Sequence, residues 1–245
     1  MSRFLSLCLF VVIWQVAAMT LGAHYLVGPD ATLAAIHREI RSGDMMFAFG
    51  VTLARALAGF SLGMLVGSAL GLALGRSQAL DRLIDPWLVI ALNTPALVVI
   101  IYAYIWVGLT ETAVLAAVTL NKIPTTAITL REGARALDSR LDDMAALFVL
   151  PRWRRWRHVV APQLAPYFAA SARGGLAMVW KIVLVVEILG RPNGVGFKMG
   201  LAFQQFDLPL LQAYVAPFVA LMIAIESVVL RPAERSASWW RRHAP

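Results

Sequence analysis

The chain has 245 residues, of which 60% are apolar and only 15% are charged. A soluble globular domain is typically about 45–50% apolar and about 25% charged, so these proportions exclude an ordinary soluble domain and favour a protein that spans a lipid bilayer. The single cysteine, Cys8, excludes an intrachain disulfide, and the scattered histidines predict no metal site.

Six apolar stretches follow one another along the chain, and each is long enough to cross a bilayer as a helix of about 20 residues. Their approximate bounds, in chain order, are 4–27, 56–74, 87–107, 111–130, 167–189 and 208–230. We therefore predict an all-α integral membrane protein with six transmembrane helices, and a single transmembrane domain over residues 1–245.

The first apolar stretch, preceded by Arg3, also has the basic tip and apolar core of a secretory signal peptide. Its length and the later spans favour a retained first helix over a cleaved leader. Residues 31–40 have the periodicity of a short amphipathic surface helix. Shorter polar connections are expected at 76–85 and, with a turn at 191–196, between the last two spans.

The second span has a glycine at every fourth position, which are Gly59, Gly63, Gly67, Gly71 and Gly75. This spacing places the glycines on one face of a helix, where another backbone can approach closely. The ridge serves either for fixed close packing or as a surface along which two helices slide.

Two later spans contain a proline beside polar residues. The third span includes Asn93-Thr94-Pro95, and the fourth includes Asn121-Lys122-Ile123-Pro124. Because proline removes a helical hydrogen bond, we expect an interruption in each span. Irregular backbone at membrane depth is tolerated only beside protein or a cavity, so both sites are expected to face away from lipid.

The basic residues are distributed unevenly between the two sides of the predicted membrane. The two ends and the connections at 76–86 and 131–165 carry 14 Lys and Arg, whereas the other three connections carry 5. The positive-inside rule therefore places both termini in the cytoplasm. Topology accounts for the net charge of +8 without a nucleic-acid partner.

The polar stretch at 131–165 predicts two short helices joined at 149–151, where a proline suits the first turn of the second helix. The first helix has a small apolar face, formed by Met144, Ala145 and Phe148. An amphipathic helix of this kind can lie in a groove on another protein.

The spacing in this stretch resembles the Glu-Ala-Ala loop of the permeases of ATP-binding-cassette importers. In that pattern an acidic residue and two small residues are followed by a glycine six positions after the acid and a proline thirteen positions later. By this resemblance, the ATPase-coupling residues are Asp143, Met144, Ala145, Ala146, Phe148, Val149 and Pro162. Val149 replaces the glycine, and because a β-branched residue resists turns that glycine permits, the conformation of the joint is left open.

The flanking chain, roughly residues 45 to 235, is similar to the nitrate, sulfonate and taurine branch of these permeases. The similar features are the glycine-bearing second span, the run from Arg157 to Pro162, Pro166, Trp180, Glu187 and the turn at 194–196. The resemblance implies a multi-pass protein of the bacterial inner membrane that pairs with a second permease copy, docks cytosolic ATPases and receives solute from a periplasmic or lipid-anchored binding protein.

The same resemblance implies a permease without catalytic residues, cofactor or metal, because a partner subunit hydrolyses ATP. The candidates for lining the translocation path are Lys122, Asn121, Asn93, Lys181 and Glu187. Lys122 either draws an anionic solute into the path or pairs with a carboxylate from another span. The substrate is left open among nitrate, taurine, alkyl sulfonates, bicarbonate and pyrimidine vitamin precursors.

The basic run from Arg152 to Arg157 has two interpretations, contact with anionic lipid headgroups or contact with the ATPase. The tryptophans and arginines at 239–242 suit a membrane interface. Three other functions are alternatives for the whole chain: a membrane enzyme acting on lipids, an ion-coupled carrier, and a non-transporting scaffold. A neighbouring gene encoding an ATPase would favour the importer over the first two.

Overall fold

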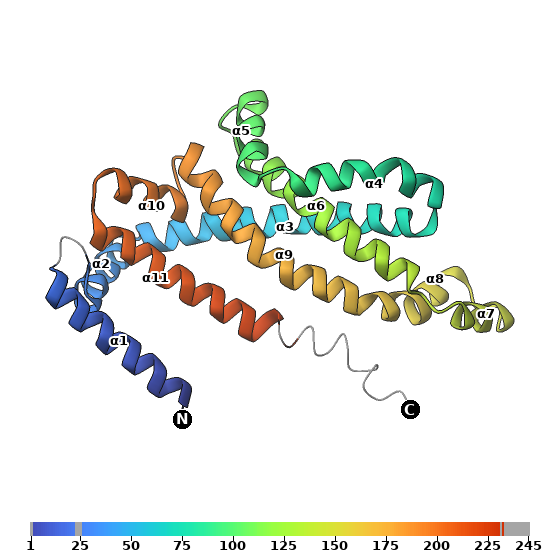
Figure 1. Cartoon of the computed structure of the whole chain (residues 1–245), viewed down its shortest axis with the longest axis horizontal. Helices are drawn as coiled ribbons and strands as arrows, with labels where there is room; N and C mark the ends of the chain where they lie inside the picture. Colours follow the sequence, from blue (N-terminus) through green and yellow to red (C-terminus); the bar gives the residue numbers. More distant parts are fainter. Residues whose placement is uncertain (1, 23–25, 231, 233–245) are drawn as a thin grey trace. The chain divides into compact units, whose positions relative to one another are not determined.

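The computed structural model describes residues 2–22, 26–230 and 232, and within these ranges every regular element is helical (Figure 1). The helices divide between two compact units. Unit 1 comprises Met1–Ala54 and Leu184–Leu221, and unit 2 comprises Arg55–Val183 and Met222–Pro245. The unit boundaries fall inside three long helices, which are α3 (Asp44–Arg76), α9 (Ala161–Gly190) and α11 (Leu208–Ile225).

Unit 1 contains α1 (Ser2–Leu21), α2 (Pro29–Arg41) and α10 (Val195–Gln204), together with one end of each long helix. The predicted amphipathic helix at 31–40 is confirmed as α2, which begins with a proline whose fixed φ favours a first helical turn. The hydroxyl of Tyr214 donates a 2.7 Å hydrogen bond to Glu39, and its ring stacks on Phe49 with centroids 6.5 Å apart. These contacts join α2, α3 and α11.

The prediction of a loop between the last two spans is wrong for most of its length. Residues 191–194 form the expected turn, but α10 occupies 195–204. The helix is only 10 residues long, and two glycines lie inside it, so its sequence pattern resembles a loop. The hydrogen bonds that fix its first turn come from distant residues of α3 and α9, which local periodicity does not reveal.

In unit 2, α6 (Glu111–Arg135) packs directly on the glycine face of α3. A Cβ built on Gly63 would lie 2.6 Å from Lys122 Cβ, and one built on Gly71 would lie 2.3 Å from the carbonyl oxygen of Ala127. Three further glycines of the ridge are as close to α6, namely Gly59, Gly67 and Gly75. The predicted close approach of two backbones is therefore confirmed.

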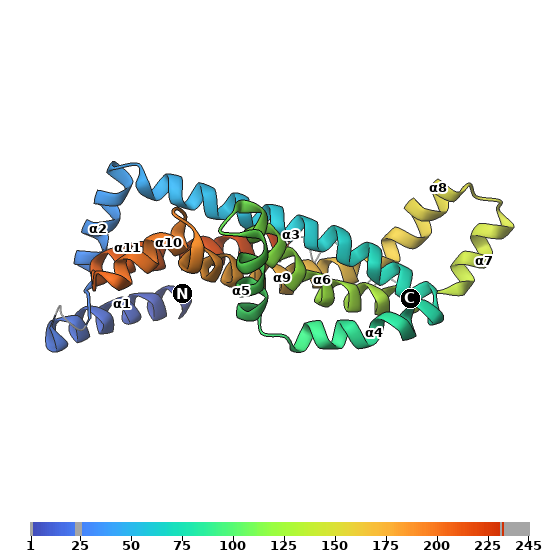
Figure 2. The same ribbon diagram turned by 90° about the horizontal axis from the view of Figure 1, so that it is seen from above.

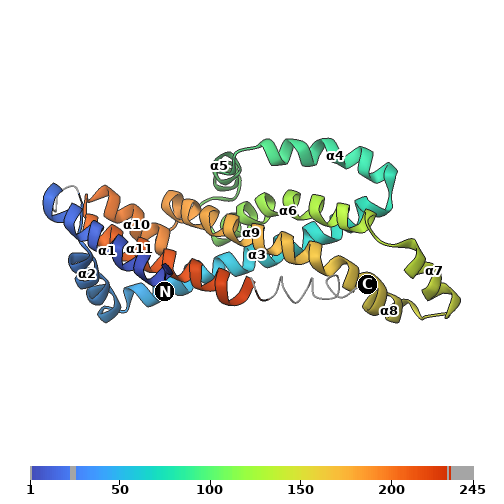
Figure 3. The ribbon, with the colours of Figure 1, turned by 60° about the horizontal axis from the view of Figure 1, so that its bottom comes forward.

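The predicted interruption at Asn93-Thr94-Pro95 is confirmed, because it separates α4 (Gln78–Asn93) from α5 (Ala96–Val107). Thr94 is extended, and the two helix axes are bent by 98°, a sharp turn that Figure 3 shows. Proline at 95 cannot continue the ladder of α4, and the residue before a proline favours an extended backbone.

The charged connection predicted at 76–85 is instead helical from residue 78. Ser77 caps α4 by accepting a hydrogen bond from the Leu80 amide at 3.3 Å. Arg131 and Arg135 of α6 then pair with Asp81, at 3.0 and 2.5 Å, and Arg131 also pairs with Asp85. These ion pairs hold the start of α4 against the end of α6, so the charges support a helix there.

The predicted break at Pro124 is wrong, because α6 continues through it without interruption. The turns on either side of the proline are held by packing, since Lys122 and Thr126 lie against successive glycines of α3. The hydroxyls of Thr125 and Thr126 also donate to the carbonyl of Lys122, at 3.0 and 3.1 Å. Neighbouring helices and hydroxyl side chains are known to make a proline tolerable inside a membrane helix.

The connection between α6 and α9 contains α7 (Ser139–Leu147), α8 (Arg152–Arg155) and the π-helical segment η1 (Trp156–Val160). The two predicted short helices joined at 149–151 are thus confirmed, and we call residues 139–160 the α7–α8 hairpin. Figure 2 shows this hairpin projecting beyond the end of α6.

Three described helices have the length and apolarity to cross a membrane: α3, α6 and the run Leu208–Val228, in which α11 continues into η2 (Glu226–Leu230). The bent pair of α4 and α5 is a fourth candidate. An all-helical protein with several apolar spans is therefore confirmed, whereas the count of six and the cytoplasmic termini stay predictions. The tryptophans and arginines at 239–242 lie outside the described residues.

Candidate functional site

The side chain of Lys122 is buried in the middle of unit 2, with 1% of its surface exposed. Glycines lie on both sides of it, because a Cβ on Gly63 would meet its stem at 2.6 Å and a Cβ on Gly175 would meet its ammonium nitrogen at 2.1 Å. The ammonium donates hydrogen bonds to the carbonyl and hydroxyl oxygens of Ser171, at 3.0 and 3.2 Å. The lysine therefore connects α6 to α9 across a gap that only glycines leave open.

The ammonium borders a cavity of about 290 Å³ between α6 and α9. Its lining consists mostly of small and hydroxyl-bearing residues, namely Lys122, Thr125, Thr129, Ala170, Ser171, Gly174, Gly175 and Met178. Three hydroxyl groups and one positive charge line this space. The hydroxyls of Thr125 and Thr129 already donate to the carbonyls of Lys122 and Thr125, at 3.0 and 2.8 Å, so the ammonium is the group best able to attract a small oxygen-rich solute.

The charge of Lys122 has no ionic partner in the described part of the chain. Its nitrogen contacts Ser171 and lies 5.9 Å from the centre of the Phe60 ring, and no described carboxylate comes within ion-pair distance. Burying an ammonium group costs several kcal/mol unless it is paired. An anion in the cavity would supply the missing partner.

The other path candidates of unit 2 are placed differently. The side chains of Asn93 and Asn121 donate to carbonyls of their own helices, Val89 and Ala117, at 2.8 Å each. Lys181 is exposed on α9. None of the three lines the cavity beside Lys122.

Glu187 belongs to unit 1, where it is completely buried. Its carboxylate accepts hydrogen bonds from the Thr52 hydroxyl at 2.9 and 3.0 Å and from the Gly196 amide at 2.9 Å. A Cβ on Gly194 would lie 2.3 Å from this carboxyl group, so only glycine fits there. Glu187 thus places a carboxylate at the positive end of α10, a favourable position for an anion.

The α7–α8 hairpin turns through a motif that normally requires glycine. Val149 has φ of 48°, the Leu150 amide bonds to the Ala145 carbonyl at 3.0 Å, and the Val149 amide bonds to the Ala146 carbonyl at 3.0 Å. These are the two hydrogen bonds of a Schellman motif, whose left-handed residue is usually glycine. A β-branched residue in this conformation is strained.

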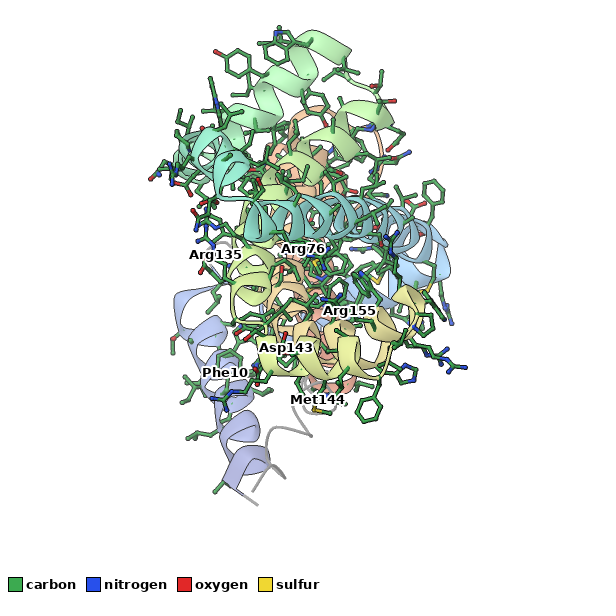
Figure 4. The ribbon with its side chains drawn as sticks, turned by 90° about the vertical axis from the view of Figure 1, so that its right-hand side faces the viewer. Phe10, Arg76, Arg135, Asp143, Met144 and Arg155 are labelled. Carbon is green, nitrogen blue, oxygen red and sulfur yellow. The ribbon has the colours of Figure 1, made fainter. Side chains whose placement is uncertain are left out.

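The apolar face of α7 differs in one residue from the prediction. Ala145 is buried with 3% exposure, whereas Met144, Leu147 and Phe148 are exposed. The spacing of these three, i, i+3 and i+4, could have identified Leu147 from the sequence. Figure 4 looks onto the hairpin, with Asp143 and Met144 on α7 and Arg155 on α8. Asp143, Ala146 and Pro162 are also exposed.

The hairpin is joined to the start of α9 by one buried amide side chain. Gln163 accepts a 2.9 Å hydrogen bond from the Asp138 amide and donates one to the Val159 carbonyl at 2.9 Å. Asp138 in turn caps α7 by accepting from the Arg140 amide at 2.9 Å. The orientation of α7 therefore depends on α9, the helix that also holds the Lys122 ammonium.

Lys122 was identifiable from the sequence, but the residues of α9 that surround its ammonium were not. Ser171, Gly174 and Gly175 lie about 50 residues away, and small residues on a membrane helix do not by themselves indicate a cavity. Among the described residues, no three His, Cys, Asp or Glu side chains gather closely enough to hold a metal ion.

Comparison with known proteins gives a consistent family. The family model described as the binding-protein-dependent transport system inner membrane component matches residues 45–234. A protein of Brucella abortus (strain 2308), named as a probable ABC transporter permease, is 24% identical over 231 residues, which cover 94% of this chain and 92% of the relative.

Two further relatives are named for anions. A permease protein of Escherichia coli (strain K12), named for aliphatic sulfonate transport, is 29% identical over 189 residues, 76% of this chain and 72% of its own. The bicarbonate transport system permease protein of Synechococcus elongatus is 25% identical over 263 aligned positions, 95% of this chain and 85% of its own.

Two solved structures share the fold. The inward-facing methionine ABC transporter MetNI has a chain that matches with a TM-score of 0.64 and 16% identity, covering 76% of this chain and 92% of that one. An amino acid ABC transporter solved with histidines matches with a TM-score of 0.59 and 17% identity, over 85% of this chain and 97% of its own.

Replacing Val149 with glycine should stabilise the turn of the hairpin. Left-handed backbone costs an L-residue roughly 1–2 kcal/mol, part of which is offset by the greater backbone entropy of glycine, so we expect a local gain of about 1 kcal/mol. Hydrogen exchange at the Val149 and Leu150 positions should slow about fivefold in Val149→Gly. Val149→Ala, which keeps a Cβ, is the matched control. Faster exchange in the glycine variant would contradict the strain.

Proposed function

The chain belongs to the family of inner-membrane components of binding-protein-dependent transport systems, and we propose that it forms the path by which an ATP-binding-cassette importer moves a small anion across the bacterial inner membrane. The observation that carries this proposal is the buried ammonium of Lys122, which borders a cavity and has no carboxylate partner in the described chain. A buried charge of this kind in a membrane helix is a functional candidate by default.

The lining of the cavity favours a small oxyanion. Lys122 supplies the charge opposite to that of an anion, and its ammonium can redirect the hydrogen bonds that it now donates to Ser171 to the oxygen atoms of a solute. The volume of about 290 Å³ lies just below the usual range for ligand sites, about 300–1,000 Å³, which suits a small solute. Relatives named for sulfonate and bicarbonate transport support an anion.

Coupling to ATP hydrolysis is assigned to the α7–α8 hairpin. The exposed apolar residues Met144, Leu147 and Phe148 lie on one face of α7, and such a face can enter a groove on a partner. The partner would be a cytosolic ATPase, with Asp143 at the edge of the contact. The assembly would also need a second permease copy and a binding protein that delivers the solute.

The hydrogen bonds of α9 suggest how the two sites communicate. Gln163 and Ser171 lie on one helix, where they hold the hairpin and the Lys122 ammonium. A displacement of α7 by the ATPase would therefore act on α9, and a shift of α9 would change the hydrogen bonds of Lys122. In one state of the transporter the Lys122 ammonium would then be free to bind solute, and in the other state it would donate its hydrogen bonds to Ser171.

Removing the charge of Lys122 should reduce uptake. Uptake is measured in cells expressing the whole transporter, with labelled nitrate, bicarbonate, taurine or ethanesulfonate, whichever the wild type accumulates. We expect Lys122→Met to lower this uptake by at least about tenfold, because a loss of about 1.4 kcal/mol of attraction has that effect. Gly175→Ala should have a similar effect, since its methyl group would displace the ammonium.

Gly174→Ala is the matched control for this experiment, because a Cβ at that position meets nothing within 4 Å although the residue lines the same cavity. Its uptake should stay within about twofold of the wild type, as expected for a substitution without a clash. Wild-type uptake by Lys122→Met, with the protein present at normal level, would show that the lysine is structural.

A charge on the exposed face of α7 should release the ATPase. We expect Phe148→Asp to reduce co-purification of the ATPase with the tagged chain in mild detergent by at least about tenfold, since a buried unpaired carboxylate is costly at an interface. Ser139→Asp adds the same charge to an exposed position at the other end of α7 and should have no effect. Equal retention of the ATPase by both variants would exclude α7 as the docking element.

A further inference from the structure

The basic segment that follows the hairpin turn takes no part in the proposed path or in the apolar docking face. Residues 151–158 are all exposed, and four of them are arginines. Two tryptophans lie among them, Trp153 with 71% and Trp156 with 43% of their surface exposed. Two exposed aromatic side chains on a strongly basic helix favour a partner that binds both cationic and aromatic groups.

The segment is a direct extension of α9. The backbone stays in the right-handed helical region at Trp156 and at Ala161, where α8 passes into η1 and η1 into α9. The 30-residue α9 is about 45 Å long, which already equals the thickness of a bilayer with its headgroup layers, about 40–45 Å. If residues 167–189 of α9 cross the membrane, as the sequence predicts, η1 and α8 follow at the inner headgroup layer.

The composition of the segment matches that layer. Trp153 and Trp156 are three residues apart, so they lie on one face of the helix, and tryptophan is enriched where membrane meets water. Arg154 and Arg157 are also three residues apart, and arginine side chains can reach back toward headgroups with their stems along apolar surface. No acidic residue occurs in the sequence between Asp143 and Glu187, so this stretch of the chain contributes only positive charge.

The ATPase is the alternative partner for this segment, but the surface of α7 suits the ATPase better. The strained turn at Val149 separates the exposed apolar face, on α7, from the basic and aromatic residues on α8 and η1. The two arms of the hairpin thus carry different chemistry. We propose that α8 and η1, through Arg154, Arg157, Trp153 and Trp156, bind the headgroups of anionic phospholipids in the cytoplasmic leaflet and fix the height of the hairpin relative to the membrane.

The proposal is tested by lipid binding to the full-length chain. Native mass spectrometry of the purified protein in detergent, titrated with phosphatidylglycerol or phosphatidylcholine, gives the preference for the anionic lipid. Each arginine near an anionic surface contributes about fivefold in affinity, so Arg154→Gln/Arg157→Gln should lower phosphatidylglycerol binding by about 25-fold. Binding of phosphatidylcholine should not change.

Two matched variants decide what the arginines do. Arg154→Lys/Arg157→Lys should keep most of the preference, because lysine and arginine are attracted to an anionic membrane surface by similar amounts. Arg38→Gln/Arg41→Gln removes the same charge from exposed positions of α2 and should keep the preference as well.

Two results would overturn the proposal. They are an unchanged phosphatidylglycerol preference in the glutamine variant, and a loss of ATPase co-purification in the glutamine variant with lipid binding intact. The last result would assign the segment to the ATPase. The uptake and α7 experiments do not depend on any of these outcomes, so failure here is distinguishable from failure of the importer proposal.

Discussion

The arrangement of unit 2 depends on where one ammonium group, that of Lys122, lies. It lies between α3 and α9, and each of these helices has a glycine where it contacts the lysine. Gly63 of α3 admits the stem of Lys122, and Gly175 of α9 admits its charged end. Any larger residue at either position would exclude the lysine from its present position. The same glycine spacing brings α6 onto α3 along several turns, which carries the helix through Pro124 without a break. The cavity is a consequence of this packing, since small residues on α9 leave space beside the charge.

The helix α9 connects this charge to the α7–α8 hairpin. Ser171 holds the Lys122 ammonium, and Gln163, about 12 Å along the same helix, holds the backbone at Asp138 where α7 begins. A rigid helix transmits a displacement between such points without a chain of side-chain rearrangements. In the proposed importer, the docking face on α7 would receive the movement of the ATPase, and α9 would deliver it to the cavity.

The sequence predicted the features that are set by a local repeat or by a single unusual residue. It did not predict the features that depend on residues far away in the chain. The four-residue spacing of the glycines predicted close packing on one face of α3, and Asn93-Thr94-Pro95 predicted the sharp bend before α5. The apparently equivalent proline at 124 lies inside a packed interface, which local sequence does not show. Lys122 was recognised as an unusual buried charge, but Ser171 and Gly175 could not be, because small residues carry no signature of what they contact. The loop of the importer permeases has a glycine where this chain has Val149, and this correspondence correctly located the turn. The structure adds that Val149 itself adopts the left-handed conformation.

The proposed role of the Lys122 cavity requires that anions enter it from water. Its most direct test uses a chain with Cys8→Ser and Thr125→Cys, which places one thiol in the cavity lining. The rates of modification by an anionic and a cationic thiosulfonate reagent of similar size are then compared in the assembled transporter. We expect faster reaction with the anionic reagent, and loss of that preference when Lys122→Met is added. Equal rates for the two reagents whether or not Lys122 is present, or no modification in any state of the ATPase cycle, would contradict it.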